Sequence, residues 1–301
     1  MQMFPNEQSA IDYLTPILWP EGPVCPYCQS KRVNPRINQR NYYYCIDCLM
    51  GKGSFFTIRK GTIFERSHIP LHKWMYAMYL IVTSSKGISS LQLSKEIGIT
   101  QKSAWFLRQR IRAACGNQTE KILSGIVEID ETYLGGLEKN KHENKKQRQG
   151  RGPTGKTPVV GMRNRDGQVV AQTVTSTDKE TMQEFVNNAV ILGSTVCTDD
   201  HASYNGLSTQ YEHKKVNHSA KQFVDGMAHT NGIESVWAVL KRGFYGIFHH
   251  FSVKHTPRYI HEFVFRMNEG NCKIDTIDRL NSLLRGAMGK RLTYEMLRCG
   301  A

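Results

Sequence analysis

IVEIDETYLGG, residues 126–136, alternates apolar and polar side chains and ends in two glycines. Successive side chains of a β-strand point to opposite faces of the sheet. Val127 and Ile129 therefore share one face, and Glu128 and Asp130 share the other. The stretch predicts a strand that carries Asp130 near its end, on the face opposite to the apolar pair.

The segments that follow predict a mixed sheet. Residues 157–174 indicate a hairpin that turns at Asp166-Gly167. An amphipathic helix over 178–190 comes next, then a short strand over 193–200 that ends in Asp199-Asp200, and a last strand over 213–219. With the helix of 229–243, the order is three strands, a helix, two strands and a helix. This is the element order of the RNase H-like fold, a mixed sheet flanked by helices.

The helix HTNGIESVWAVLKRG, residues 229–243, places an acid and a base two turns apart. A helix advances about 100° per residue, so Glu234, Trp237 and Lys241 point in similar directions. A simpler interpretation is local. Asn231 would cap the helix, Glu234 would complete a capping box, and Trp237 would belong to the core.

Charge and hydropathy narrow the function classes. The 301 residues hold 40 Lys and Arg against 26 Asp and Glu, a net charge of +14. This excess favours a polyanionic partner, with nucleic acid first and a membrane surface second. No apolar run approaches the roughly 18–20 residues of a spanning helix. No secretion signal is recognised at the N-terminus, so we expect a cytoplasmic, nucleoid-associated protein without membrane contact.

Four of the eight cysteines form two tight pairs, Cys25 with Cys28 and Cys45 with Cys48. Two C-x2-C pairs at this spacing are typical of a zinc ribbon, in which four thiolates complete a tetrahedron. Paired disulfides are the alternative, and a reducing compartment argues against them. With four cysteine ligands no coordination position stays open, so the zinc is expected to be structural.

Residues 70–115 predict helices. A helix that ends near Gly98 and a second that begins at Thr100 outline a helix-turn-helix. The N-terminal residues of the second helix would face base edges in a major groove; they are Thr100, Gln101, Lys102 and Ser103. Further along, that helix carries Arg108, Arg110 and Arg112. The alternative is a plain three-helix bundle with a solvated basic face.

A basic loop over 137–157 follows the strand that carries Asp130. It holds Lys145, Lys146 and Arg148 among seven basic residues and has no apolar residue after Leu137. A charge run of this kind is usually a solvated loop. Its position after the Asp130 strand suggests instead that it clamps DNA phosphates.

The chain resembles the DDE transposases of bacterial insertion sequences, in the zinc-ribbon group related to the Merlin elements. Six blocks carry the resemblance in order: WPEGPVCPYC, GTIFERSHIPLHKW, VEIDETYLGG, TDDHASYNGL, HTNGIESVWAVLKRG and HHFSVKHTPRYIHEFVFRMN. The resemblance implies that Asp130, Asp199 and Glu234 are the catalytic acids and that Lys241 is the basic residue two turns after the third. Asp199 is chosen over Asp200 because it follows the Thr of the family's Thr-Asp pattern. Asn231 is the alternative third residue.

The chemistry of phosphodiester cleavage explains these residue types. Two divalent ions roughly 3.5–4 Å apart can activate a nucleophile and hold the leaving oxygen. Hard ions such as Mg²⁺, or Mn²⁺ in its place, take carboxylate ligands, which Asp130, Asp199 and Glu234 would supply. Lys241 would hold a phosphate near the cut.

The sequence thus predicts a multi-domain α/β protein. Its expected parts are a zinc ribbon with an N-terminal helix (1–60), a helix-turn-helix module (61–118), an RNase H-like catalytic domain (119–270) and a C-terminal helical tail (271–301). The expected function is transposition: binding terminal inverted repeats of double-stranded DNA, cutting, and joining 3′ ends to a target. A homodimer is expected because two ends must be brought together. Two rivals stay open, a DNA-binding regulator without catalysis and a metal-dependent nuclease without strand transfer.

Overall fold

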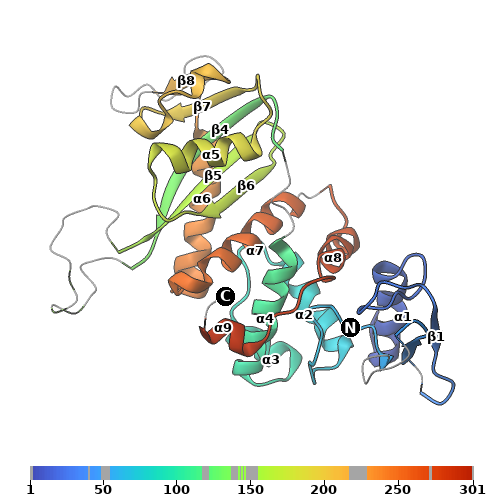
Figure 1. Cartoon of the computed structure of the whole chain (residues 1–301). Helices are drawn as coiled ribbons and strands as arrows, with labels where there is room; N and C mark the ends of the chain where they lie inside the picture. The colour runs from blue at the N-terminus through green and yellow to red at the C-terminus, as the bar shows by residue number, and fades with distance from the viewer. Residues whose placement is uncertain are drawn as a thin grey trace. The chain divides into compact units, whose positions relative to one another are not determined.

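The computed structural model in Figure 1 divides into two compact units. The first comprises Met1–Gly116 with Cys272–Ala301, and the second Asn117–Asn271. The structure describes residues 3–39, 41–48, 55–116, 122–136, 142, 144, 146, 155–216, 229–270 and 273–299. Of the basic-loop residues named above, Lys145 and Arg148 lie outside these ranges.

The first unit begins with a small antiparallel sheet in the order β1-β2-β3. Its strands are β1 (Val33–Pro35), β2 (Tyr43–Cys45) and β3 (Phe55–Phe56). Behind the sheet, the ring of Trp19 packs edge-on against Tyr43 at 5.3 Å between centroids and against Phe56 at 6.1 Å. Trp19 and Phe56 are buried and Tyr43 is half-buried, so these rings form part of the apolar core of the module.

Helices make up the rest of the first unit. They are α1 (Glu7–Leu18), α2 (Leu71–Thr83), α3 (Ser90–Ile97), α4 (Gln101–Cys115), α8 (Thr276–Arg285) and α9 (Tyr294–Cys299). The C-terminal helix α8 packs against α1, α2 and α4. The C-terminal residues therefore complete the core of the N-terminal unit.

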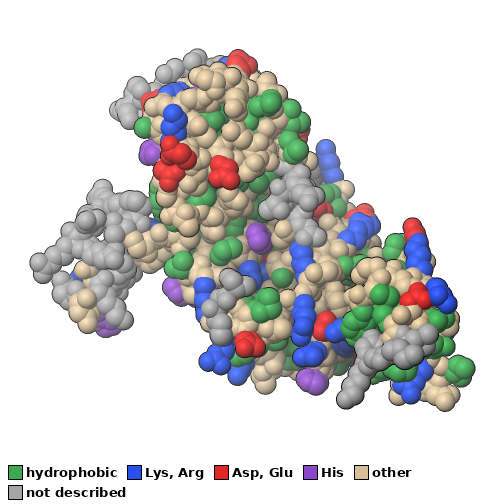
Figure 2. Space-filling view, viewed as in Figure 1, with side chains coloured by type: hydrophobic (Ala, Val, Ile, Leu, Met, Phe, Trp, Pro, Cys, Tyr) green, Lys and Arg blue, Asp and Glu red, His purple; other side chains and the backbone are tan. Residues whose placement is uncertain are grey.

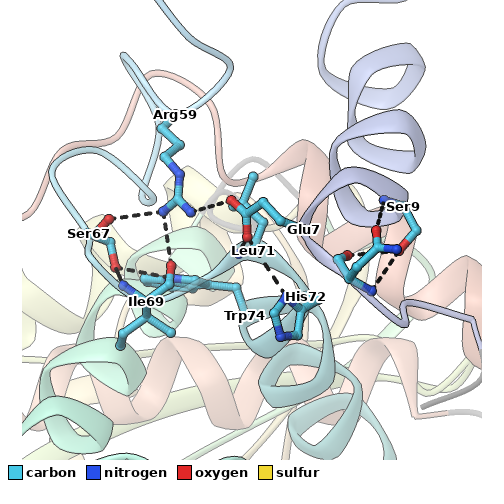
Figure 3. Close-up of polar contacts among 9 residues, drawn as sticks. Glu7, Ser9, Arg59, Ser67, Ile69, Leu71, His72 and Trp74 are labelled. Carbon is cyan, nitrogen blue, oxygen red and sulfur yellow. Dashed lines mark hydrogen bonds and ion pairs between the residues drawn. The ribbon is translucent and has the colours of Figure 1, made fainter. Parts of the chain in front are cut away.

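Glu7 joins the start of α1 to the start of α2 (Figure 3). Its carboxylate accepts hydrogen bonds from the backbone N–H of Leu71 and, at 2.6 Å, from the guanidinium of Arg59. The other terminal nitrogen of Arg59 donates to the carbonyls of Ser67 at 3.1 Å and Ile69 at 3.0 Å. Since α2 has no cap from its own sequence, Glu7 supplies a partner for its first N–H group.

The helix-turn-helix outline is confirmed. Helix α3 ends at Gly98, whose φ of 61° is the left-handed conformation of a C-cap glycine. Helix α4 starts after Thr100, whose side chain accepts from the N–H of Ser103.

The arginines of α4 do not form the solvated basic face of the alternative interpretation. Arg108, Arg110 and Arg112 are buried. Arg110 donates to the carbonyl of Leu292 at 3.0 Å and to that of Glu65. Long Arg side chains can bury their stems and satisfy their N–H groups on backbone carbonyls. Arg110 thus stabilises the unit and is not exposed for DNA.

The second unit is built on a five-stranded sheet in the order β6-β5-β4-β7-β8. The strands are β4 (Ile126–Leu134), β5 (Thr157–Asn164), β6 (Val169–Thr173), β7 (Thr195–Asp199) and β8 (Glu212–Val216). Neighbours among β6, β5 and β4 are antiparallel, whereas β7 and β8 run parallel to β4. This is the mixed sheet that the sequence predicts, with the hairpin turn at Gly167 as expected.

Helices cover both faces of this sheet (Figure 1). The helical segments of the unit are α5 (Lys179–Ala189), α6 (Asn231–Gly243), α7 (Thr256–Glu269), the 3₁₀ turns η4 (Ala202–Tyr204), η5 (Leu207–Thr209) and η8 (Val253–His255), and a π-helical turn η7 (Phe244–Phe248). One core joins Val127 and Ile129 of β4 to Phe185 of α5. The other joins Leu134 of β4 to Trp237 of α6 and to α7. The predicted division of β4 into two faces is therefore confirmed.

Candidate functional site

The four paired cysteines lie together in the first unit. The Sγ atoms of Cys25 and Cys48 are 3.7 Å apart, and those of Cys28 and Cys45 are 3.6 Å apart. A disulfide needs about 2.05 Å. A tetrahedron with Zn–S bonds of about 2.3 Å has edges of about 3.8 Å. The spacing fits one zinc ion held by four thiolates and excludes the disulfide alternative for these four residues.

The sheet register places the first two acids side by side. Strands β4 and β7 pair in parallel, with Val127 opposite Val196 and Glu128 opposite Cys197. Extending the register by two residues brings Asp130 opposite Asp199. Paired residues point to the same face, so both carboxylates share the face that α6 covers, and Asp200, which is exposed, points away.

A glycine lets α6 approach this face closely. Gly161 of β5 pairs with Asp130, and a Cβ atom on Gly161 would lie 2.7 Å from Cζ2 of Trp237. The indole, 4% exposed, thus fills the space above the strand next to Asp130. Trp237 is a core residue, as the simpler interpretation has it, while Glu234 and Lys241 of the same helix are exposed.

Asp199 and Glu234 both act electrostatically on Asp130. The pKa of Asp130 is raised to about 7, first by burial, then by the charge of Glu131, with further contributions from Asp199 and Glu234. A hydrogen bond from the backbone of Glu131 acts in the opposite direction. Asp199 and Glu234 thus lie close enough to Asp130 to disfavour its charged form, and a bound cation would relieve this repulsion.

The acids do not form a tight cage by themselves. Among the described residues, the four cysteines are the only set of three or more His, Cys, Asp or Glu side chains whose ligand atoms all lie within 4.8 Å of one another. The donor set of Asp130, Asp199 and Glu234 nevertheless fits a hard divalent ion. Mg²⁺ is usually held by one or two carboxylates, with water and substrate phosphate completing its shell.

Two residues that the sequence did not single out lie behind Asp130, on the other face of β4. Glu131 lies on the opposite face of β4 from Asp130 and accepts a hydrogen bond from the hydroxyl of Tyr204 at 2.8 Å. Burial, and then the charge of Asp199, raise the pKa of Glu131, against the bond from Tyr204. Two consecutive acids in an apolar strand were a signal for Glu131. No sequence pattern pointed to Tyr204, because only the fold brings this residue next to β4.

The start of α6 differs from the local prediction. Asn231 is the first residue of the helix and is exposed, so the predicted Asn231 cap is wrong. The hydroxyl of Thr230 donates to the carboxylate of Glu234 at 3.1 Å. The N–H of Ile233 instead donates to Oε2 of Glu128 at 2.7 Å. A remote buried carboxylate thus takes the place of the local cap.

The side chain of Lys241 makes no hydrogen bond or ion pair to any described residue. It lies in the last turn of α6, where a cation is favoured by the helix dipole.

The predicted base-reading residues occupy the exposed start of α4. The hydroxyl of Thr100 donates to Ser103 at 2.9 Å, and the amide of Gln101 donates to Ser90 at 2.9 Å. The ammonium of Lys102 lies 5.3 Å from the centre of the Tyr294 ring. On the face shown in Figure 2, Lys and Arg side chains gather over the helices of the first unit.

Two family models match the chain. The ISXO2-like transposase domain matches residues 122–268, and the transposase zinc-ribbon domain matches residues 5–49. Together they cover well over half of the sequence. The first match contains all three candidate acids, and the second contains all four paired cysteines.

Individual proteins are also similar. A protein of Halobacterium salinarum, described as an uncharacterized protein in transposable element ISH50, is 27% identical over 257 residues, which cover 80% of this chain and 84% of that protein. A chain in the crystal structure of a pre-cleavage Mos1 transpososome aligns at 11% identity over 73% of this chain and 80% of that one, with a TM-score of 0.27. A score this low does not by itself establish a shared fold. No helix in the described part of the chain is long and apolar enough to cross a membrane.

Proposed function

Because the chain belongs to the ISXO2-like transposase family with a transposase zinc ribbon, we propose that it is the transposase of an insertion sequence. It binds the terminal inverted repeats of its element as double-stranded DNA, cuts phosphodiester bonds there and joins the freed 3′ ends to a target. This work is done in the cytoplasm, at the nucleoid. A homodimer is the simplest assembly, since two ends must be synapsed.

The observation that carries the proposal is the convergence of three acids on one face of the sheet. Asp130 and Asp199 come from adjacent parallel strands, and Glu234 comes from the helix that packs over them. Burial, then the charge of Glu131, and to a lesser extent the charges of Asp199 and Glu234 raise the pKa of Asp130 to about 7. A stable fold keeps such an arrangement where a cation or a reaction compensates for its cost.

In this proposal the three carboxylates hold Mg²⁺ or Mn²⁺. When bound, such ions activate the attacking oxygen and neutralise charge on the phosphate. Asp130 must lose its proton for this, and Asp199, in the adjacent strand, completes the pair of ligands from the sheet. Lys241, exposed on the same helix as Glu234, contacts a phosphate and orients the DNA strand for in-line attack.

DNA recognition is assigned to the first unit and the basic loop. Thr100, Gln101, Lys102 and Ser103 at the start of α4 read base edges. Lys145, Lys146 and Arg148 contact phosphates. With several such contacts, log K falls with log salt at a slope of roughly −0.9 per neutralised phosphate. Neutralising the three loop residues together would make this slope shallower without changing end-sequence preference, and an unchanged slope would remove the loop from the interface.

The decisive test is cleavage and joining of DNA that carries both inverted repeats flanking the gene, by purified zinc-loaded protein with Mg²⁺ or Mn²⁺. Asp130→Asn, Asp199→Asn and Glu234→Gln should each lower cleavage by orders of magnitude while folding and end binding persist. Asp200→Asn is the matched control for Asp199→Asn and should be far milder. Lys241→Ala should weaken cleavage less than loss of an acid.

The same assay separates the rivals. Specific binding without any cleavage would make the protein a regulator, and cleavage without joining would make it a nuclease. Glu234→Gln preserves an acceptor for the Thr230 hydroxyl. If Glu234 only stabilises the start of the helix, this variant should therefore lose little cleavage activity. Normal cleavage by Glu234→Gln, together with a dead Asn231→Ala, would move the third catalytic position to Asn231.

A further inference from the structure

The strand that carries Asp130 also holds a second, buried carboxylate. Glu128 is only 2% exposed. It lies two residues before Asp130 on the same face of β4, about 7 Å along the strand. No metal-binding or catalytic role above uses it, although burying a charge is costly unless the charge is paired.

The partner of Glu128 is the start of the helix that carries Glu234. Its Oε2 accepts a hydrogen bond at 2.7 Å from the N–H of Ile233, the residue directly before Glu234. The first N–H groups of a helix have no partner within the helix. The residue in the N-cap position of α6, Thr230, makes no side-chain cap bond. A carboxylate at this end is also favoured by the helix dipole.

Two further contacts show that the approach is tightly fitted. A Cβ atom on Gly232 would lie 2.6 Å from Nη1 of Arg163 and 2.7 and 2.8 Å from the two oxygens of Glu128, so a side chain there would have to displace the carboxylate and the guanidinium. Arg165 forms an ion pair with Glu128, and Nδ1 of His229 lies 3.4 Å from the same carboxylate. The charge of Glu128 is thus compensated by Arg165, with His229 beside it at the start of α6.

We propose that Glu128 is a positioning residue, which fixes the start of α6 on β4 and thereby sets the separation of Asp130 and Glu234. Asp130 is two residues from Glu128 along the strand, and Glu234 is one residue from its hydrogen-bond partner. One buried bond therefore links the two elements that present the metal ligands. The inference rests on the proposed function, in which these acids hold divalent ions.

The test compares Glu128→Gln with Glu128→Leu in the full-length, zinc-loaded protein. Gln keeps an oxygen that can accept from Ile233, whereas Leu has similar bulk and no acceptor. Glu262 of α7 supplies the matched control, because it is also a buried carboxylate in the same unit, with Arg266 at 3.7 Å. Mn²⁺ binding without DNA is measured by electron paramagnetic resonance, and hydrogen exchange is measured for residues 229–243 and 157–173.

Glu128→Leu should weaken Mn²⁺ binding about 10- to 100-fold, as expected for loss of a residue that orients metal ligands. Glu128→Gln should restore much of it. Exchange should speed up at the start of α6 and stay unchanged in the β5–β6 hairpin. Glu262→Leu should leave Mn²⁺ binding within about twofold of the unaltered protein, whatever it does to stability.

If Glu128→Leu does not fold, Gly232→Ala tests the same contact by displacing the carboxylate, and it should show the same changes. Unaltered Mn²⁺ affinity in these variants, or equal loosening of the whole unit, would overturn the inference. Mn²⁺ binding that is absent from the unaltered protein, or that survives Asp130→Asn, would instead sink the proposed function. The exchange measurement would still decide whether Glu128 anchors α6.

Discussion

Gly161 and Trp237 are in direct contact across the sheet–helix interface. A Cβ atom on Gly161 would lie 2.7 Å from Cζ2 of the indole, and Gly161 is also the residue that pairs with Asp130. The closeness of α6 to the acid-bearing strand thus depends on the absence of one methyl group. The same contact makes the candidate site sensitive to packing.

Gly161→Ala should therefore lower both stability and cleavage. Forcing a methyl group against the buried indole should cost about 1–3 kcal/mol of unfolding free energy, because the core must shift to admit it. The shift moves α6, and Glu234 with it. Urea denaturation and the cleavage assay measure the two effects. Gly136→Ala is the control, since a Cβ there meets nothing within 4 Å; equal behaviour of both variants would contradict the prediction.

The stability of the protein without added Mg²⁺ or Mn²⁺ should depend on pH through Asp130. Its pKa is raised to about 7, chiefly by burial and by the charge of Glu131, against about 3.9 in an unfolded chain. The native state therefore holds an extra proton between these values. The contribution of this proton to the unfolding free energy is fully present below about pH 4 and is lost as pH rises through 7. Its size is about 1.4 kcal/mol for each unit by which the two pKa values differ.

Asp130→Asn removes this titration. The difference in unfolding free energy between the variant and the unaltered protein should shift in favour of the variant from pH 4 to pH 8, as urea curves at each pH would show. Asp200→Asn, at the exposed neighbour of Asp199, should leave the pH profile unchanged. Parallel profiles for Asp130→Asn and the unaltered protein would show that Asp130 ionises normally.

Removal of zinc should unfold the ribbon selectively. Metal analysis should find about one zinc per chain, and binding of such an ion is worth on the order of 10 kcal/mol to a small module. Cys25→Ser should abolish zinc binding and raise hydrogen exchange around Trp19 and Tyr43. The five-stranded sheet should keep its protection against exchange. Cys115→Ser changes a buried cysteine outside the cluster and should retain the zinc. A disulfide between Cys28 and Cys45 in the native protein would contradict the site.

Glu7→Ala should destabilise the first unit more than a typical surface change. It removes the partner of the Leu71 N–H and of the Arg59 guanidinium, and we expect a cost of about 1 kcal/mol because the carboxylate is partly exposed. Glu21→Ala is the control. Glu21 pairs with Lys31 at the surface, and such pairs contribute little. Equal midpoints in urea for the two variants would show that Glu7 is not a significant cap.

Much of the fold follows from local pattern. The alternation of residues 126–136 predicts both the strand and its two faces, and the turn residues predict the β5–β6 hairpin. The cysteine spacing predicts the four-thiolate cluster, because a C-x2-C turn presents two sulfurs to one ion wherever it occurs. Asp130 and Asp199 could be placed at the ends of two strands of the expected fold, and their assignment as catalytic acids came from the family resemblance.

The same patterns fail where a side chain serves a distant partner. The basic residues of the helix over 101–115 suggested either a DNA-reading helix or a solvated basic face, yet Arg110 is turned inward to Leu292, 182 positions away in the chain. Glu131 could be noticed as a second acid in a strand, but its bond to Tyr204 could not be predicted.

By itself the sequence determined the elements, their order and the zinc ligands, because periodicity and spacing act over a few residues; the candidate acids came from its resemblance to a family. Only the tertiary structure decided how two helices begin. The first N–H groups of α2 and α6 find carboxylates 64 and 105 positions away, in Glu7 and Glu128. An unsatisfied N–H accepts whichever buried carboxylate the fold brings within reach, and no local rule specifies which one that is.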